Sequence, residues 1–504
     1  MLARVITFAV EGVDARRVWV EADIRLGLPA FTVVGLADKA VREARERVRA
    51  ALVNSGYEFP LRRITVNLAP AYLRKVGPAF DLPLAVALLV ASGQLEAEAV
   101  ESCAIVGELS LTGEVRPVRG ALAVAEGTRR HELKRLVLPR ARAREASLVP
   151  DIEIVGVESL TELVATMRGD EVPAGLPVET VEAHEEIPDL ADVRGQNGLI
   201  LGLEVAAAGG HNLFLQGPPG TGKTMIARRL PSILPPLGPE EAIEVTRIQS
   251  IAGLRGAAGL VRERPFRAPH HTVSAAGLVG GANPPQPGEA TLAHRGVLFL
   301  DELSEFSRPS LESLRQPLED GHVTIVRGQQ VMAFPTRFML VAASNPCPCG
   351  LGGPRCQCTQ ADLARHRRRL SGPLLDRIDI LMRVERPPSE ALRRQAAPSS
   401  ATVRERVVAA RERQEQRLSG EPETCNAQLT SRQIRELGQV TPSALRLLAE
   451  LYDRYSLSAR GHTRILRVAR TVADLDGSDL VGPEHVNVAA SLRLDDSTPL
   501  AEAA

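Results

Sequence analysis

The residues most able to do chemistry lie in one short loop, 217–224. Its glycines let backbone N–H groups approach a polyphosphate, Lys223 can reach the outer phosphates, and the Thr224 hydroxyl can take a position around Mg²⁺. The run 210–216 leads into the loop as a buried strand would, and apolar residues after the loop open a helix. We therefore predict that ATP and Mg²⁺ bind here, with the nucleotide on Gly217, Pro218, Pro219, Gly220, Thr221, Gly222, Lys223 and Thr224.

Two adjacent carboxylates, Asp301 and Glu302, follow the apolar run 297–300. In a parallel sheet, a strand carries such residues to the edge where ligands bind. There Asp301 could hold the Mg²⁺ shell, and Glu302 could polarise a water molecule against the γ-phosphate. Strands that end in surface acids are common, so this prediction depends on the phosphate-binding loop upstream.

Two further polar side chains are candidates to complete a hydrolysis site. Asn345 follows the apolar run 338–344, where its amide could contact the γ-phosphate or the attacking water. The alternative is a turn residue before Pro346. Arg377 lies in the short segment 371–379. Its guanidinium could stabilise charge on a nucleotide bound by an adjacent subunit, or it could form a local salt bridge with neighbouring acids.

Four of the six cysteines form two closely spaced Cys-x-Cys pairs, Cys347 with Cys349 and Cys356 with Cys358. Four thiolates in such a span can close a tetrahedral Zn²⁺ site, although the spacing is tighter than in the usual zinc knuckle. The alternative is four reduced thiols in a cytosolic loop. Because the cluster follows Asn345 directly, a closed zinc site would brace the loop that carries this residue.

The composition of the 504 residues excludes several classes of protein. The 61 basic and 61 acidic residues cancel, so nucleic acid would have to bind local patches. The clustered cysteines do not resemble a secreted disulfide framework. The first residues lack the pattern of a signal peptide, and the longest apolar stretch, about 82–91, is predicted to be a buried helix too short to cross a membrane. We predict a cytoplasmic, soluble protein with no membrane partner.

We predict an α/β protein of three domains. Residues 1–168 alternate strand-like and helical runs, including an amphipathic helix over 39–55. Residues 169–189 are acidic, contain Pro and Gly, and suit a linker. Residues 190–388 are predicted to form an ATPase core, a parallel sheet with helices on both faces. Residues 389–497 are predicted to form an all-helical lid.

Over essentially its whole length, the chain resembles the ComM/YifB family of magnesium-chelatase-like AAA+ ATPases. The resemblance rests on the phosphate-binding loop, the acidic pair, the helical lid and the segments 267–272, 343–350 and 457–461. It implies a ring-shaped homo-hexamer that hydrolyses ATP at subunit boundaries. It also implies a DNA helicase that drives branch migration in recombination and natural transformation.

The same resemblance implies roles for single residues. Asn345 would be the first sensor, Arg377 the finger acting in trans, and Arg460 the second sensor reaching back from the lid, with Arg464 and Arg467 as nearby alternatives. One other function stays open: an ATP-driven remodelling or chelatase-like module acting on a protein partner, as the motor subunit of magnesium chelatase does. A third possibility, a nucleotide-gated scaffold without turnover, is disfavoured by the presence of Glu302.

Residues 1–168 resemble the substrate-facing domain of Lon-type proteases, also found fused to the recombination protein RadA. The matching segments are 77–81 and 111–118. A protease of this type needs a serine nucleophile where Ala79 stands and a lysine base near Leu122. Because neither residue is present, this resemblance implies a non-catalytic scaffold or binding platform.

Two segments of the predicted ATPase core are additional to what a minimal ATPase domain needs. Residues 262–293 are rich in Gly and Pro, and 322–334 have a strand, turn, strand pattern. In this family's fold such hairpins would project into the pore of the ring. The residues that could then grip a DNA backbone, without reading bases, are Arg264, Arg267, His270, His271 and Arg327. The alternative is that the histidines form contacts between subunits and that the hairpin has only a packing role.

A second basic cluster, 365–369, lies on a predicted helix. Charge runs are usually solvated faces, so this cluster is the weaker DNA candidate. Aromatic residues make up only 3% of the chain, which disfavours base stacking as a mode of binding.

Overall fold

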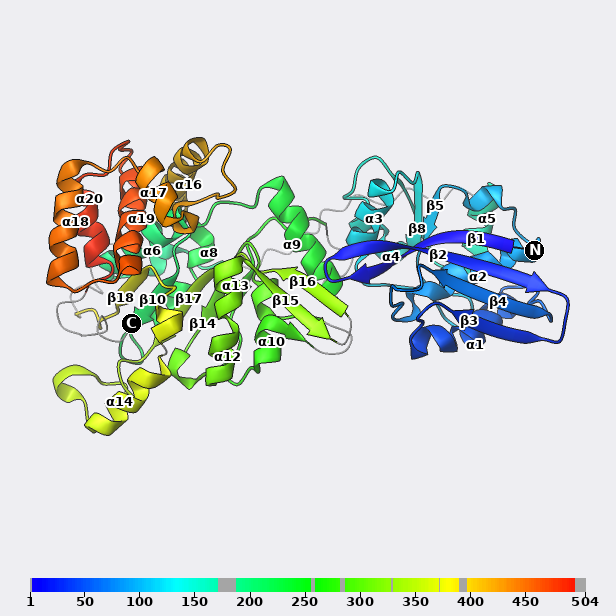
Figure 1. The fold of residues 1–504 in the computed structure, drawn as a ribbon, viewed down its shortest axis with the longest axis horizontal. Helices are drawn as coiled ribbons and strands as arrows, with labels where there is room; N and C mark the ends of the chain where they lie inside the picture. The colour runs from blue at the N-terminus through cyan, green and yellow to red at the C-terminus, as the bar shows by residue number, and fades with distance from the viewer. Residues whose placement is uncertain are drawn as a thin grey trace.

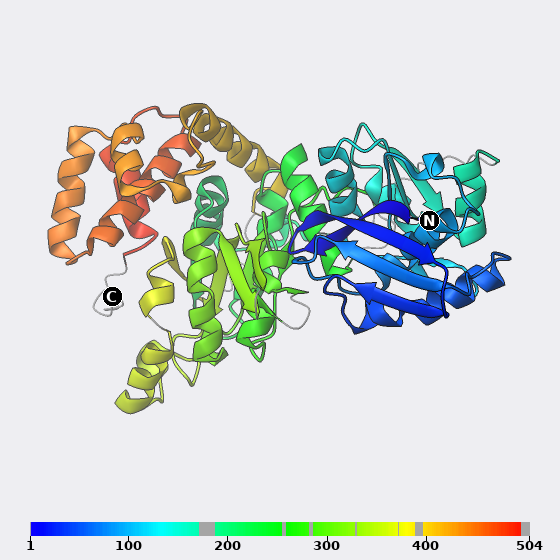
Figure 2. The same cartoon turned by 45° about the vertical axis from the view of Figure 1, so that its right-hand side comes forward.

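The computed structural model describes residues 2–170, 187–254, 259–281, 286–327, 330–370, 372–388 and 397–494. The chain is elongated, with an α/β domain at one end, a second α/β domain in the middle and a helical domain at the other end (Figure 1 and Figure 2). This confirms the predicted fold class. Most of the predicted acidic linker, 171–186, lies outside the described residues, and the domain boundaries stay predictions.

The N-terminal domain is built on a seven-stranded sheet in the order β3-β4-β2-β1-β5-β8-β9. β1 and β2 pair antiparallel along their whole length, whereas β5, β8 and β9 run parallel. The strands are β1 Leu2–Glu11, β2 Asp14–Arg25, β3 Ala30–Val34, β4 Arg63–Ala69, β5 Cys103–Ile105, β8 Arg135–Pro139 and β9 Glu153–Val157, with a separate pair of β6 Glu108–Leu109 and β7 Val115–Arg116. The helices are α1 Lys39–Asn54, α2 Asp81–Ala91, α3 Ala121–Arg130, α4 Arg140–Ala146 and α5 Leu160–Arg168.

The two helices predicted in this domain are both present. α2 is buried at every position, as its continuous apolar sequence predicts. α1 begins after Asp38, whose carboxylate accepts the N–H of Val41 at 2.8 Å and caps the helix. The buried carboxylate of Asp81 accepts two hydrogen bonds from the Arg47 guanidinium, at 2.7 and 3.0 Å. This bidentate pair offsets the cost of burying a charge at the start of α2.

The central domain carries a five-stranded, all-parallel sheet in the order β11-β14-β17-β10-β18. The strands are β10 Leu213–Gln216, β11 Phe266–Arg267, β14 Val297–Leu300, β17 Met339–Ser344 and β18 Ile380–Arg383. The helices are α6 Asn197–Gly209, α7 Lys223–Ala227, α8 Leu230–Ile233, α9 Pro239–Ala252, α10 Ala275–Val279, α11 Glu289–Leu292, α12 Arg308–Ser313, α13 Arg315–Asp320, α14 Gln360–Arg369 and α15 Gly372–Leu375. The strand predicted over 210–216 starts later, because Gly210 takes a left-handed conformation that ends α6.

Both faces of this sheet are covered, because alternate side chains of each strand enter different cores. Leu213 and Leu215 pack with α6 and the helical domain, whereas Phe214 between them packs with residues of α10 and α12. The parallel arrangement brings the carboxyl ends of β10, β14 and β17 to one edge. This is the edge at which open α/β sheets bind ligands.

The predicted strand, turn, strand segment forms an antiparallel hairpin of β15 His322–Arg327 and β16 Gln330–Pro335. Its tip, 328–329, lies outside the described residues. Ile325 and Phe334 are buried on one face of the hairpin, whereas Val326 and Val331 on the opposite face are exposed. A second short pair joins β12 Gly280–Gly281 to β13 Gln286–Pro287.

The C-terminal domain is helical, as predicted. It consists of α16 Ser400–Arg417, α17 Ser431–Leu437, α18 Pro442–Arg454, α19 Ala459–Leu475 and α20 Pro483–Ser491. α19 begins after Ser458, whose side chain accepts the N–H of Gly461 and caps the helix. α16 and α19 pack against α6, so the core of the sheet continues into this domain.

Helix α9 joins the central and N-terminal domains. Ile251, near its end, is buried within a core of the N-terminal domain, where α9 packs on α3. Arg247 on the same helix forms an ion pair with Glu126 of α3 at 3.0 Å and lies 3.7 Å from Asp14. The β1–β2 turn also packs on the hairpin through Val13. The N-terminal domain is therefore held to the central domain at two places.

Candidate nucleotide-hydrolysis site

The phosphate-binding loop leaves the carboxyl end of β10 and enters α7. A Cβ atom on Gly217 would lie 2.1 Å from the Val384 carbonyl oxygen, so only glycine fits there. Gly220 and Gly222 have φ angles of 74° and 90°, a left-handed region that favours glycine. The sequence pattern thus meets its predicted strand, loop, helix context.

Lys223 is nearly buried at the start of α7. Its ammonium donates hydrogen bonds to the carbonyl oxygens of Gly217 and Pro218, at 2.6 and 2.9 Å, and to Asn345 Oδ1 at 3.1 Å. Burial lowers the pKa of Lys223, while Asp301 and Glu302 act in the opposite direction. The lysine predicted to reach the outer phosphates therefore also links the loop to the end of β17.

The predicted Mg²⁺ ligands meet directly. The Thr224 hydroxyl donates a 2.6 Å hydrogen bond to Asp301 Oδ2, and the other carboxylate oxygen of Asp301 accepts the N–H of Glu302 at 2.9 Å. A hydroxyl and a carboxylate are oxygen donors of the kind that Mg²⁺ prefers. This pair fits the ligands of an ion that is bound together with nucleotide phosphates.

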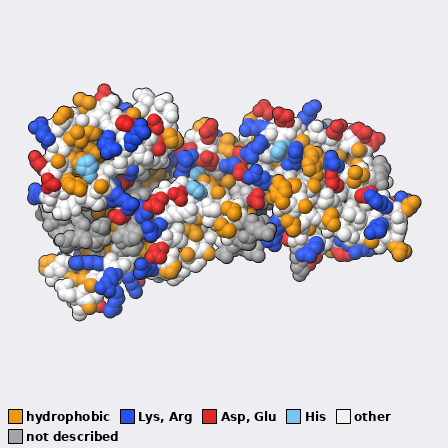
Figure 3. Space-filling view, viewed as in Figure 1, with side chains coloured by type: hydrophobic (Ala, Val, Ile, Leu, Met, Phe, Trp, Pro, Cys, Tyr) orange, Lys and Arg blue, Asp and Glu red, His pale blue; other side chains and the backbone are white. Residues whose placement is uncertain are grey.

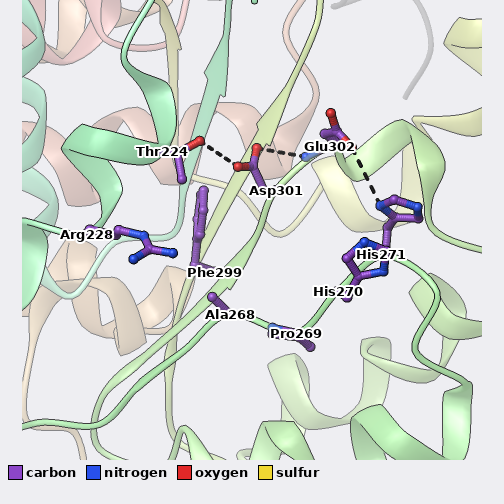
Figure 4. A pocket seen from close by; sticks show the side chains of 9 residues that line it. All are labelled: Thr224, Arg228, Ala268, Pro269, His270, His271, Phe299, Asp301 and Glu302. Carbon is purple, nitrogen blue, oxygen red and sulfur yellow. Dashed lines mark hydrogen bonds and ion pairs between the residues drawn. The ribbon is translucent and has the colours of Figure 1, made fainter. Parts of the chain in front are cut away.

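Glu302 follows β14 in a left-handed conformation, with φ 51° and ψ 48°. For a residue other than glycine, this left-handed backbone conformation costs about 1–2 kcal/mol. The turn aims the carboxylate into a pocket, where Oε2 lies 3.6 Å from Nδ1 of His271 (Figure 4). The pocket is lined by Thr224, Arg228, Ala268, Pro269, His270, His271, Phe299, Asp301 and Glu302.

His270 and His271 therefore lie beside the predicted catalytic carboxylate, with their ring centroids 4.0 Å apart. They follow β11, which is the parallel neighbour of β14, so they reach the same edge of the sheet as Asp301. Sequence reasoning missed this position because β11 has only two residues. Arg228 was also missed, although it lies one helical turn after Thr224. Contact of the two histidines with DNA stays a prediction.

The other predicted DNA residues are not among those that line this pocket. Arg267 donates two hydrogen bonds to the Glu289 carboxylate, at 2.7 and 2.9 Å. Arg264 pairs with Glu241 at 2.8 Å and donates to the Arg295 carbonyl at 2.7 Å. The side chain of Arg327 lies outside the described residues.

Asn345 adjoins the four predicted zinc ligands. Besides its contact with Lys223, its carbonyl oxygen accepts a hydrogen bond from His366 Nε2 at 3.1 Å. The sulfur atoms of Cys347, Cys349, Cys356 and Cys358 all lie within 4.8 Å of one another, a set that could hold a metal ion.

The predicted trans finger and second sensors share one neighbourhood. The Arg377 guanidinium pairs with Glu319 of α13, and burial lowers its pKa, as do the nearby Arg315, Arg460 and Arg464. Arg460 is 70% exposed and lies 3.8 Å from Asp376. Arg464 is buried, 4.0 Å from Asp376 and 3.8 Å from Asp379. Neither geometry selects one of them as the second sensor.

In the N-terminal domain, the positions that a Lon-type protease would use carry no catalytic group. Ala79 is partly buried against the domain core, and Leu122 is fully buried. The Leu122 N–H donates a 3.1 Å hydrogen bond to the buried Glu145 carboxylate. This carboxylate therefore satisfies a backbone donor at the start of α3. Among the helices described, none has the length and apolar character needed to cross a membrane.

Family models for magnesium chelatase match most of the chain. The model for magnesium chelatase, subunit ChlI, matches residues 189–392, that for its C-terminal part matches 397–493, and that for subunit ChlI of Mg-chelatase matches 20–142.

Relatives similar from end to end include YifB and ComM proteins. YifB of Escherichia coli is 43% identical over 499 residues, covering 98% of this chain and 97% of YifB. Competence protein ComM of Haemophilus influenzae is 41% identical over 503 residues, covering 98% of this chain and 97% of ComM. A Lon protease of Chloroflexus aurantiacus is 27% identical over 161 residues, 29% of this chain and 19% of that protease. With the phosphate-binding loop and acidic pair meeting at one sheet edge, the chain belongs to the ComM/YifB family of magnesium-chelatase-like AAA+ ATPases.

Proposed function

We propose that this protein is a cytoplasmic, ATP-hydrolysing motor that assembles as a hexamer and moves DNA, with branch migration as its reaction. The observation that carries the ATPase part is the convergence of Lys223, Thr224, Asp301, Glu302 and Asn345 at the carboxyl ends of three neighbouring strands. Phosphoryl transfer to water requires a lysine on the phosphate-binding loop, a hydroxyl and a carboxylate that hold the metal ion, and a base.

Each of these residues has a definite task in hydrolysis. Lys223 would exchange its contacts with the loop carbonyls for the outer phosphates, and Thr224 and Asp301 would hold Mg²⁺. The ion supplies charge neutralisation at the phosphate oxygens. Glu302 would accept the proton of the attacking water, and Asn345 would orient that water beside Lys223. A Zn²⁺ ion on Cys347, Cys349, Cys356 and Cys358 is the remaining cofactor in this proposal.

The hexamer is proposed because phosphoryl transfer needs positive charge beside the phosphates, and a neighbouring subunit can supply it. A guanidinium acting in trans stabilises charge that develops during the transfer. Arg377, the candidate for this role, pairs with Glu319 and is grouped with other guanidiniums. Rings would place such a residue at every subunit boundary.

DNA is favoured over a protein substrate by the similarity to a competence protein along the full chain. The second candidate, remodelling of a protein partner, is favoured by the match to magnesium chelatase models. The test is branch migration on a synthetic four-way junction by the wild type, Lys223→Ala and Glu302→Gln. We expect activity only in the wild type, with DNA-stimulated ATPase that falls steeply as salt rises. Wild-type inactivity on every DNA substrate, with turnover indifferent to DNA, would favour the protein substrate.

A further inference from the structure

The four-cysteine cluster is compact enough to enclose a zinc ion, since its sulfur atoms all lie within 4.8 Å of one another. Three sulfur separations are 3.3 Å between Cys347 and Cys349, 3.8 Å between Cys349 and Cys356, and 3.6 Å between Cys356 and Cys347. A tetrahedral ion with Zn–S bonds of about 2.3 Å sets its sulfurs about 3.8 Å apart. All four cysteines are free, so the cluster is not a pair of disulfides.

The backbone around the cluster is shaped to support thiolates. The Cys349 N–H points at the Cys358 sulfur at 3.3 Å, and the Gly352 N–H points at the Cys347 sulfur at 3.4 Å. Outer hydrogen bonds of this kind orient metal ligands and stabilise their charge. Four sulfur donors in a closed arrangement select zinc among common divalent ions.

The cluster is connected to the nucleotide site in three ways. Cys347 lies two residues after Asn345, the residue that contacts the loop lysine. Gly350, inside the cluster, packs on the phosphate-binding loop, since a Cβ atom there would lie 3.0 Å from Pro219 Cδ. α14 begins just after Cys358, and its buried His366 donates to the Asn345 carbonyl oxygen.

We propose that Cys347, Cys349, Cys356 and Cys358 bind one Zn²⁺, and that this ion clamps Asn345 against the phosphate-binding loop, so that metal occupancy controls ATP turnover. The clamp deepens the proposed ATPase function and rests on it. The ion would tie the first cysteine pair to the second, and so fix the glycine-rich loop that runs from Asn345 to α14. The clamp is therefore a positioning device, distinct from the residues that contact the phosphates.

The metal is tested first on the whole protein. Purified wild type should contain close to one zinc per chain, and Co²⁺ exchanged into the site should give the intense thiolate-to-cobalt absorption and visible bands of a tetrahedral four-sulfur site. Cys349→Ser with Cys356→Ser should abolish both signals. Cys103→Ala, which removes a buried thiol of the N-terminal domain, should keep them. Zinc-free wild type that cannot take up cobalt would overturn the proposal.

The clamp is tested by stripping zinc from the wild type with a strong chelator and restoring it. We expect ATP turnover to fall about 10- to 100-fold and to recover with Zn²⁺, while affinity for a non-hydrolysable ATP analogue changes much less. His366→Gln should retain zinc yet also lower turnover, which separates positioning from folding. Unchanged turnover after stripping would overturn the clamp. Zinc-dependent turnover without any DNA response would instead leave the clamp standing and contradict the DNA motor.

Discussion

The Thr224 hydroxyl donates a 2.6 Å hydrogen bond to Asp301, joining the start of α7 to the end of β14. The two residues are far apart in the chain, and the parallel sheet brings them together. Thr224→Ala removes this donor and one proposed Mg²⁺ ligand, whereas Thr224→Ser keeps both. We expect the Mg²⁺ concentration for half-maximal ATPase to rise at least about tenfold in Thr224→Ala, by roughly 1.4 kcal/mol or more. Equal Mg²⁺ dependence of the two variants would contradict this assignment.

A finger acting in trans has a signature that a residue acting within its own subunit lacks. Arg377→Ala should lower turnover by about 10³-fold or more and leave binding of an ATP analogue intact. Lys223→Ala should abolish binding as well. Mixing the two inactive proteins should restore part of the ATPase, because one subunit then supplies the loop and its neighbour the guanidinium.

The complementation experiment has a matched control in Glu319→Gln. This change releases Arg377 from its ion pair while keeping the guanidinium. The Glu319→Gln protein should retain its ATP turnover without mixing. If the Arg377→Ala and Lys223→Ala mixture were no more active than its components, the shared-site hypothesis would fail.

Docking of the N-terminal domain depends on the end of α9. Ile251 is buried in that domain's core, whereas Leu254, just beyond the helix, is 57% exposed. Ile251→Ala should weaken the contact between the N-terminal and central domains by about 2–5 kcal/mol. Differential scanning calorimetry should then show the N-terminal domain unfolding separately from the ATPase core. Leu254→Ala should leave the wild-type profile unchanged, and identical profiles for both variants would argue against this docking.

We expect Lys75 to make the stability of the N-terminal domain depend on pH. It is fully buried, and burial lowers its pKa from 10.5 to about 8. Between these pH values the unfolded chain binds more protons at this residue than the folded chain does, so its contribution to the free energy of unfolding rises with pH. Relative to Lys75→Met, the wild type should gain stability from about pH 8 to 10.5 and show a constant difference below pH 8. Urea unfolding of both proteins across this range measures the effect, and a difference independent of pH would contradict it.

Helix α14 offers a direct test of backbone contacts with DNA. It projects from the ATPase core, and Lys and Arg side chains gather on this projection (Figure 1 and Figure 3). Arg367 and Arg368 are exposed there, whereas the adjacent His366 is buried. Arg367→Ala with Arg368→Ala should weaken binding to all DNA sequences alike. The slope of log K against log salt should fall by about 0.9 for each phosphate that the variant no longer neutralises. An unchanged slope would exclude α14 from the DNA interface.

The sequence by itself determined the features that local pattern encodes. The phosphate-binding loop at 217–224, the carboxylates after an apolar strand and the helices of the lid follow from backbone freedom and hydrophobic periodicity over a few residues. The continuous apolar run of α2 predicted a buried helix for the same reason. The α/β class and the helical C-terminal domain could therefore be predicted before any tertiary contact was known.

Only the tertiary structure decided which distant residues meet. His271 reaches Glu302 because a two-residue strand pairs beside β14, a neighbour too short to be predicted from periodicity. Arg377 pairs with Glu319 on another helix, and Ile251 enters the core of a different domain. These contacts depend on sheet order and packing between segments far apart in the chain, and neither is encoded in the spacing of nearby residues.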